Sequence, residues 1–469
     1  MVRRTRPFIQ QAYPNATIKG QPIHWPERKL KTINYNLEAT YQGIYENVVS
    51  LIESLRLAPY RLEHYKQQGE KRDVFEEGRE EALAGIFKSR YLKRFESSIE
   101  AFRISVRRAL EFLQTCETFL DAGKMLNSAD FQKALRYLAS EDEEDDVTAG
   151  NGSARQGRNG GADALAGQDE IIAPSLFDPL PSSRAGELAG GEEAQAFVET
   201  LPALDATLYD LAHVRRDIRL DIAALRTIWQ QIAAITPQQD TKLARLKELL
   251  TGDLRGKKVL IFTYYKDTAR YLARQLWSDE PEMRAWRADA GSPLIRRMDS
   301  GADARERAEL VARFAPLANN RLDIAGSEQE ITVMISTDVL SEGQNLQDCG
   351  VLINYDLHWN PTRMIQRAGR IDRIGSSFDT LWILNMFPDA GLEELLGLVE
   401  SLTRKIHEID RSGMLDASVL GEAAHPQNFN TLRRIVEEDG QVVEEQEQFA
   451  ELVSSEFLLQ QLKDRLTES

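Results

Sequence analysis

The pattern of apolar and polar positions divides the chain into a helical part and an alternating part. Within residues 36–138, apolar side chains recur at intervals of three and four, for example over 83–113, which predicts amphipathic helices. Residues 196–235 show the same period, which ends at Pro237, and residues 240–250 predict one further helix. The first half of the chain is therefore predicted to be mainly helical.

From Lys257 onward, short apolar runs alternate with segments of helix length. This alternation is typical of a parallel sheet whose strands are joined by crossover helices. The predicted strands are residues 259–263, 331–336, 351–355 and 381–386, and the predicted helices are residues 266–277, 305–314, 362–373 and 392–410. The predicted fold class is therefore α/β, with a doubly wound parallel sheet and an additional, mostly α-helical region.

Three segments differ from these two parts. Prolines make the first 35 residues an extended lead-in. Residues 140–195 begin with a run of six acidic residues and continue through Gly, Ser, Ala and Asn, so they hold too few large apolar side chains to form a core. We expect a disordered acidic insertion there. Residues 413–469 are expected to form an acidic tail, helical over 441–466.

Charge and cysteine content restrict the classes of protein to be considered. The formal net charge is −16, but residues 141–200 contribute −11 and residues 435–469 contribute −8, so the rest carries +3. A mildly basic body is compatible with a phosphate backbone as ligand. Cys116 and Cys349 suggest neither a disulfide framework nor a metal site. No apolar run is long enough for a membrane span or signal peptide, so we expect a cytoplasmic protein.

Two stretches near the predicted sheet carry candidate chemistry. The first, Ser336-Thr-Asp-Val-Leu-Ser-Glu-Gly-Gln-Asn-Leu-Gln347, follows a strand, and open α/β sheets bind ligands at that end of their strands. The second, Gln366-Arg-Ala-Gly-Arg-Ile-Asp-Arg-Ile-Gly375, spaces Gln366, Arg370 and Arg373 by four and three, which predicts one helix face. Two guanidinium groups there could bind a polyphosphate and offset charge that develops in phosphoryl transfer.

Each feature alone has an ordinary structural explanation. Arginine pairs at helical spacing are more often surface salt-bridge partners than catalytic groups, and a Ser-Thr-Asp sequence after a strand is often a helix cap. A buried aromatic pair at the end of a strand is at least as good an explanation for Tyr264 and Tyr265. We expect Trp359 to be a packing residue and His358 to be an exposed or satisfied imidazole.

Taken together, the order and spacing of these stretches resemble motifs five and six of superfamily-two helicases. The run Asn354-Tyr-Asp-Leu-x-Trp-Asn-Pro361 ahead of Gln366-Arg-x-Gly-Arg-Ile-Asp-Arg-Ile-Gly375 is especially similar to Swi/Snf-like bacterial ATPases. Residues 258–265 resemble motif four. Less specifically, Arg3-Arg-Thr-Arg6 and Leu92-Lys-Arg-Phe-Glu-Ser-Ser98 are similar to elements that follow motif three and that lie in the helical region of bacterial members.

The resemblance implies a RecA-like C-terminal lobe in which each motif has a role. Arg370 and Arg373 would be arginine fingers for ATP, and Gln366 would orient the nucleotide or water. Gly343 and Gly369 would let the backbone approach the nucleotide. The expected DNA contacts are Ser336, Thr337, Asn345, Tyr264 and Lys266. The implied organisation is a lead-in from the end of lobe one (1–35), a helical protrusion (36–139), the insertion (140–195), a helical connector (196–250), the C-terminal lobe (251–412) and the tail (413–469).

The motifs of the first lobe are missing from this sequence. The closest matches to a phosphate loop place Met125 and Lys258 where a hydroxyl residue is needed, and the acidic run at 141–146 does not follow an apolar strand. The chain is therefore expected to be inactive alone, with ATP and Mg²⁺ bound mainly by a lobe-one partner. It would be half of a split enzyme, a truncated form, or a module that works without hydrolysis.

Three functional hypotheses follow from this sequence. The first is an enzyme lobe that acts on duplex DNA with a lobe-one ATPase chain. The second is a DNA- or protein-binding module whose arginines are idle. The third is an interaction protein that works through its helices and acidic tail. A partner chain that carries the missing motifs would discriminate between them.

Overall fold

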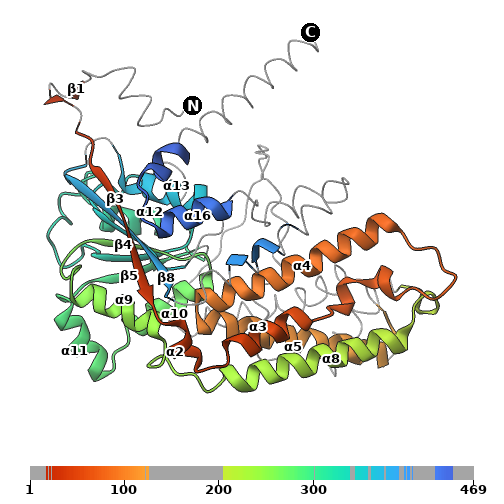
Figure 1. Ribbon diagram of the computed structural model, residues 1–469. Coiled ribbons are helices and arrows are strands. Elements are labelled where there is room, and N and C mark those ends of the chain that lie inside the picture. The colour runs from red at the N-terminus through yellow and green to blue at the C-terminus, as the bar shows by residue number, and fades with distance from the viewer. Residues whose placement is uncertain are drawn as a thin grey trace, which may run out of the picture.

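A computed structural model gives the fold as an α/β lobe from which a helical region extends as an arm (Figure 1). The structure describes residues 17–18, 21–22, 24–121, 123–125, 204–299, 301–338, 344–356, 361–373, 376–389, 396–397, 399–401, 404 and 428–446. The predicted insertion, most of the predicted tail and most of the predicted helix 392–410 lie outside these residues. No helix in the described ranges is long and apolar enough to cross a membrane.

The lobe is built on a six-stranded sheet in which every neighbouring pair is parallel, in the order β3-β8-β7-β4-β6-β5. The predicted α/β fold class is therefore confirmed. The strands are β3 (Glu27–Tyr35), β4 (Val259–Phe262), β5 (Ile295–Met298), β6 (Val333–Ser336), β7 (Val351–Asn354) and β8 (Thr380–Pro388). A separate pair of two-residue strands, β1 (Thr17–Ile18) and β2 (Gln21–Pro22), precedes them.

The four predicted strands are the four interior strands, and the two strands that the sequence did not predict, β3 and β5, are the edges of the sheet. An interior parallel strand is buried on both faces, so it is a continuous apolar run, as in Val259-Leu-Ile-Phe262. An edge strand needs no such run. Strand β3 reads Glu-Arg-Lys-Leu-Lys-Thr-Ile-Asn-Tyr and is exposed at several positions.

Alternate residues of the strands point to opposite faces, and each face packs into its own core. Val259 and Ile261 of β4 belong to one core, and Leu260 and Phe262 belong to the other. Helices α9 (Thr241–Thr251) and α10 (Lys266–Leu276) cover the first face, whereas α12 (Ala304–Phe314) and α13 (Pro361–Ile371) cover the second. Helices α11 (Pro281–Asp289) and α16 (Asn428–Val436) complete the lobe.

The helical region consists of α2 (Leu37–Tyr41), α3 (Tyr45–Ser54), α4 (Val74–Ser97), α5 (Ile99–Asp121) and α8 (Leu211–Ile232), with 3₁₀ turns at Ala58–Tyr60, Leu62–Tyr65 and Ala206–Leu208. The predicted helical stretch 83–113 is two helices, because Ser98 has the extended backbone angles φ −162° and ψ 151°. The buried apolar side chains of this helical region pack into the same core as the first face of the sheet. The arm and the lobe are therefore packed together.

Candidate functional site

Polar side chains gather where the interior strands end. Phe262 of β4 lies in register with Ser336 of β6 and Asn354 of β7, so the residues after these positions meet at one edge. That edge is the carboxyl end of a parallel sheet, where the sequence predicted a ligand site. Helix α13 begins a few residues beyond β7 and packs against it.

Arg367, which the sequence analysis missed, is the central cation of this edge. Its Nε and Nη2 donate to the two carboxylate oxygens of Asp338 at 2.7 and 2.9 Å, and its Nη1 donates to Asn354 Oδ1 at 3.1 Å. The guanidinium lies 5.0 Å from the ring centroid of Phe262, and the residue is 2% exposed. A bidentate pair of this kind fixes both partners. Arg367 therefore ties α13 to the ends of β6 and β7.

A signal for Arg367 was present in the sequence. The buried face of α13 also holds Met364, Ala368 and Ile371, which are spaced as the apolar stripe of an amphipathic helix. Arg367 occupies this stripe, where a charged residue requires a partner. The sequence could have identified a buried arginine, but not the carboxylate that pairs with it.

The predicted arginines lie at the end of α13, but not on one helix face as expected. Arg370 belongs to the last turn and is 5% exposed. The helix ends at Ile371, so Arg373 lies in the following turn, where its backbone N–H donates to the Ile371 carbonyl at 3.2 Å. Its Nη1 donates to Asn345 Oδ1 at 2.6 Å. The prediction of a single face was wrong because the helix stops two residues before Arg373.

Gln366 and Gly369 lie on the same helix and are partly exposed. A Cβ added at Gly369 would meet no atom within 4 Å apart from its own helix and chain neighbours. This open position beside Arg370 fits the approach of a phosphate group to the backbone. Gly343, His358 and Trp359 lie outside the described residues.

The five residues expected to contact DNA divide into two groups. Ser336 and Thr337 are 0% and 6% exposed, and Ser336 Oγ donates to the Thr337 carbonyl at 2.8 Å. Their burial does not fit a side-chain contact with DNA. Asn345 and Lys266 are partly exposed, and Tyr264 is 44% exposed. Among the described residues, therefore, these three side chains are the expected contacts that reach the surface.

Tyr264 and Tyr265 form an edge-to-face pair with ring centroids 4.8 Å apart, but the expectation of a buried pair was wrong, because Tyr264 is 44% exposed. Tyr265 is covered by the Arg94 guanidinium, 4.6 Å from its ring centroid, and burial raises the pKa of its hydroxyl. Arg94 in turn donates to Asp267 at 2.8 Å. The tyrosine pair thus has a half-buried member, Tyr265, held by Arg94, and an exposed member, Tyr264.

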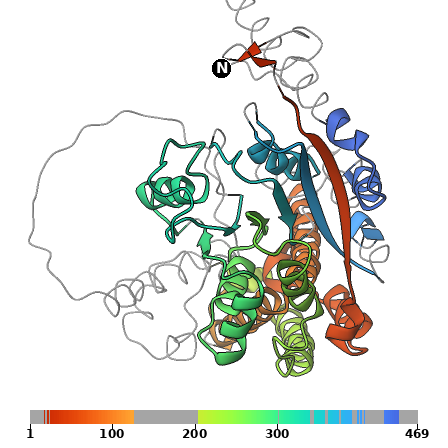
Figure 2. The same ribbon diagram turned by 90° about the vertical axis from the view of Figure 1, so that its left-hand side faces the viewer.

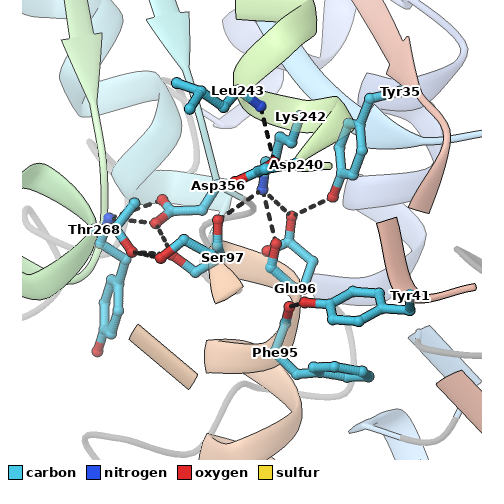
Figure 3. A network of polar contacts seen from close by, with 12 residues as sticks. Tyr35, Tyr41, Phe95, Glu96, Ser97, Asp240, Lys242, Leu243, Thr268 and Asp356 are labelled. Carbon is cyan, nitrogen blue, oxygen red and sulfur yellow. Dashed lines mark hydrogen bonds and ion pairs between the residues drawn. The ribbon is translucent and has the colours of Figure 1, made fainter. Parts of the chain in front are cut away.

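Asp356, the second residue after β7, joins the helical region to this edge (Figure 3). Its carboxylate accepts from the Tyr264 backbone N–H at 2.7 and 2.9 Å and from Ser97 Oγ at 2.7 Å. Ser97 Oγ also lies 2.7 Å from Thr268 Oγ1. Burial raises the pKa of Asp356, although the Arg367 charge opposes this shift. The sequence predicted neither this contact nor its partners.

A buried ion pair lies beside this network. Lys242 Nζ donates to Glu96 Oε1 at 2.7 Å and to the Glu96 carbonyl at 2.9 Å, and the two side chains are 4% and 1% exposed. Tyr35 donates to the same Glu96 oxygen at 3.1 Å. Glu96 and Ser97 both come from the Leu92–Ser98 stretch noted in the sequence. This stretch is where α4 contacts the lobe.

Three relatives match parts of this chain. The uncharacterized ATP-dependent helicase YqhH of Bacillus subtilis (strain 168) is 44% identical over 82 residues, 18% of this chain and 14% of that protein. DEAD-box ATP-dependent RNA helicase 40 of Oryza sativa subsp. japonica is 27% identical over 157 residues, 34% of this chain and 16% of that protein. The RNA polymerase-associated protein RapA of Sodalis glossinidius (strain morsitans) is 30% identical over 127 residues, which are 27% of this chain and 11% of that protein. The aligned parts are thus a small share of each relative.

A family match agrees with these relatives. Residues 241–375 match the family described as "Helicase conserved C-terminal domain". These residues include α9, four of the six strands and helix α13 with its arginines. Residues 241–375 therefore form a domain of the helicase C-terminal type.

Proposed function

We propose that this chain supplies the C-terminal lobe and helical protrusion of a Swi/Snf-like, DNA-dependent ATPase that moves along duplex DNA. The observation that carries the proposal is the end of α13. There Arg370, the open position at Gly369 and the turn that holds Arg373 follow one another where the helix ends and the chain leads toward β8. This is the arrangement that an arginine finger needs if a phosphate is presented from outside the lobe.

In this proposal, ATP with Mg²⁺ is held mainly by a lobe-one polypeptide, because the chain has no phosphate loop of its own. Bound ATP supplies the phosphoryl group that is transferred to water. Arg370 and Arg373 stabilise the negative charge that develops on the γ-phosphate, and Gln366 orients the nucleotide or water. The hydrogen bond from Arg373 to Asn345 already orders that guanidinium, which lowers the entropy lost on binding.

Duplex DNA is the proposed nucleic acid, and its support is the Swi/Snf-like form of motifs five and six. Tyr264 and Lys266, just beyond the carboxyl end of β4, and Asn345 are partly or well exposed and would contact the DNA backbone. The proposed location of such an enzyme is the cytoplasm.

A second candidate is a non-catalytic binding module. The observation that favours it is the burial of Arg370, which is 5% exposed, together with the hydrogen bond that engages Arg373 within the chain. In a module of this kind, both arginines would serve the structure of the lobe, and nucleic acid would bind without turnover.

ATP hydrolysis with and without duplex DNA separates the two candidates. It should be measured on this chain alone and on a mixture with a polypeptide that carries a phosphate loop and a magnesium-binding motif. We expect hydrolysis only in the mixture, with stimulation by DNA. Absence of ATP hydrolysis in every mixture, together with measurable DNA binding, would support the binding module.

Substitution of Arg373 tests the finger in the active mixture. Arg373→Ala is expected to lower turnover by roughly 10³- to 10⁵-fold while the affinity for DNA is nearly unchanged. The matched control is Arg363→Ala, which removes an exposed arginine from the helix α13 that precedes Arg373. Equal turnover in Arg373→Ala and Arg363→Ala would exclude Arg373 as the finger.

A further inference from the structure

Strand β3 comes from a part of the chain far from α13, yet it lies beside the residues that follow this helix. All nine of its residues pair in parallel with β8, from Glu27 opposite Thr380 to Tyr35 opposite Pro388 (Figure 2). Strand β3 also precedes the helical region, whereas β8 follows α13 in sequence. The sheet therefore joins the beginning of the chain to the segment that leaves the candidate finger helix.

A buried ion pair reinforces this junction. Arg28 Nε donates to Asp372 Oδ2, and the two side chains are 8% and 3% exposed. A charge-assisted hydrogen bond from which water is excluded is strong and directional. Asp372 stands between Arg370 and Arg373 in sequence, and its backbone N–H makes the last helical bond of α13, to the Ala368 carbonyl at 3.0 Å. The pair therefore fixes the residue at which helix α13 ends.

Residues at and just before the start of β3 also bind the segment between α13 and β8. The Glu27 backbone N–H donates to the Asp379 carbonyl at 2.8 Å, and His24 Nε2 lies 3.1 Å from the Phe378 carbonyl oxygen. Within the turn, the Ser376 backbone N–H donates to the Arg373 carbonyl at 3.1 Å. Residues 24–28 thus bind the segment between α13 and β8 at several points.

We propose that Arg28 is a positioning residue for the arginine fingers: by holding Asp372, it sets where Arg370 and Arg373 stand relative to the phosphate. This inference rests on the proposed function. It assigns to β3 a role beyond that of an edge strand, because a shift of about 1 Å in a catalytic group can lower a rate by roughly 100-fold. A purely structural pair would instead affect stability and leave the rate per folded molecule unchanged.

The test compares Arg28→Gln with Lys31→Gln, a matched control on the same strand whose ion pair with Asp253, at 3.4 Å, is exposed and away from the turn. In the active mixture, Arg28→Gln is expected to lower kcat by roughly 10- to 100-fold, with less than about a twofold change in the KM for ATP. Arg28→Lys, which keeps the charge, should recover part of the loss. Lys31→Gln should match the parent chain.

Hydrogen exchange on the full chain supplies a readout that needs no hydrolysis. Amides of residues 370–376 should exchange faster in Arg28→Gln and at the parent rate in Lys31→Gln, while amides of β4 stay unchanged. Absence of hydrolysis in the parent mixture would reject the proposed function, and the exchange result would then decide whether Arg28 orders the turn. A folded Arg28→Gln with the parent kcat, or with parent exchange rates at 370–376, would overturn the inference.

Discussion

Ser97 donates a hydrogen bond from Oγ to Oδ2 of Asp356 at 2.7 Å, although the two residues are 259 positions apart in sequence. Ser97 is the last residue of α4, and Asp356 follows β7, so one bond connects the arm to the carboxyl edge of the sheet. Because the Ser97 hydroxyl gives its single proton to Asp356, it accepts from Thr268 Oγ1, 2.7 Å away. The contact is therefore one link in a chain of buried hydroxyl groups.

Removal of the Ser97 hydroxyl should destabilise the fold. Ser97→Ala leaves the buried Asp356 carboxylate with one donor fewer, so the free energy of unfolding should fall by about 1.5–3 kcal/mol. Urea unfolding followed by circular dichroism measures the change. Ser54→Ala, which removes an exposed hydroxyl bonded to the Leu51 carbonyl, is the control and should change stability little. Equal stability of the two variants would show that the Ser97 bond contributes nothing net.

The buried pair of Lys242 and Glu96 should behave differently when broken and when replaced. Lys242→Met leaves Glu96 buried with its charge uncompensated and is expected to destabilise the fold by about 3–5 kcal/mol. The double variant Lys242→Met, Glu96→Leu removes both charges and should recover much of that loss. A double-mutant cycle in urea makes the comparison, and additive losses in the two single variants would contradict it.

A methyl group added at Gly369 should raise the stability of the fold and lower the turnover of ATP. The position is inside a helix and has open space, so Gly369→Ala should raise the free energy of unfolding by about 0.5–1 kcal/mol. If the nucleotide approaches this backbone, turnover of the active mixture should nevertheless fall by roughly 10-fold or more. Parent-level turnover in the stabilised variant would remove Gly369 from the nucleotide site.

Gly350→Ala serves as the contrasting variant for the measurement of stability. An added Cβ would lie 2.7 Å from a ring carbon of Phe378. This overlap forces a shift in packed atoms, so Gly350→Ala should be destabilised by about 1–3 kcal/mol. Two glycines of the same lobe, Gly350 and Gly369, are therefore expected to respond to the same substitution with opposite signs.

Glu80 predicts a pH dependence of stability. Burial raises the pKa of its carboxyl from 4.5 to about 7, while hydrogen bonds from the backbone of Glu63 and Leu62 oppose the shift. The folded state therefore binds this proton more tightly than the unfolded state, so stability falls as the pH rises from about 4.5 to 7. Glu80→Gln removes this loss and keeps an oxygen that can accept from the Glu63 N–H.

The expected difference is confined to higher pH. At pH 8, Glu80→Gln should be more stable than the parent chain by about 1 kcal/mol, a value reduced for the partial exposure of the side chain. At pH 4 the two should be nearly equal. Thermal or urea unfolding at both pH values gives the comparison, and a constant difference at both would show that Glu80 does not titrate in this way.

The sequence predicted the interior of the lobe because local pattern alone identifies such strands. Strands β4, β6, β7 and β8 are apolar runs that a doubly buried parallel strand requires, and the helices between them follow from the spacing of apolar residues. The edge strand β3 carries charged residues on its exposed side, so its sequence gives no such signal. It becomes a strand because the edge of β8 offers nine residues of backbone partners.

The residues of the candidate site likewise divide into those that the sequence identified and those that only the tertiary structure revealed. The sequence by itself determined the order and chemistry of the motifs, including the arginines at 370 and 373 and the hydroxyls after β6, because these are properties of neighbouring residues. Only the tertiary structure decided that Arg367 pairs with Asp338, that Arg28 reaches Asp372 and that Ser336 is buried. These pairings join residues from different strands and helices, up to 344 positions apart, and no local pattern encodes which distant side chain will meet them.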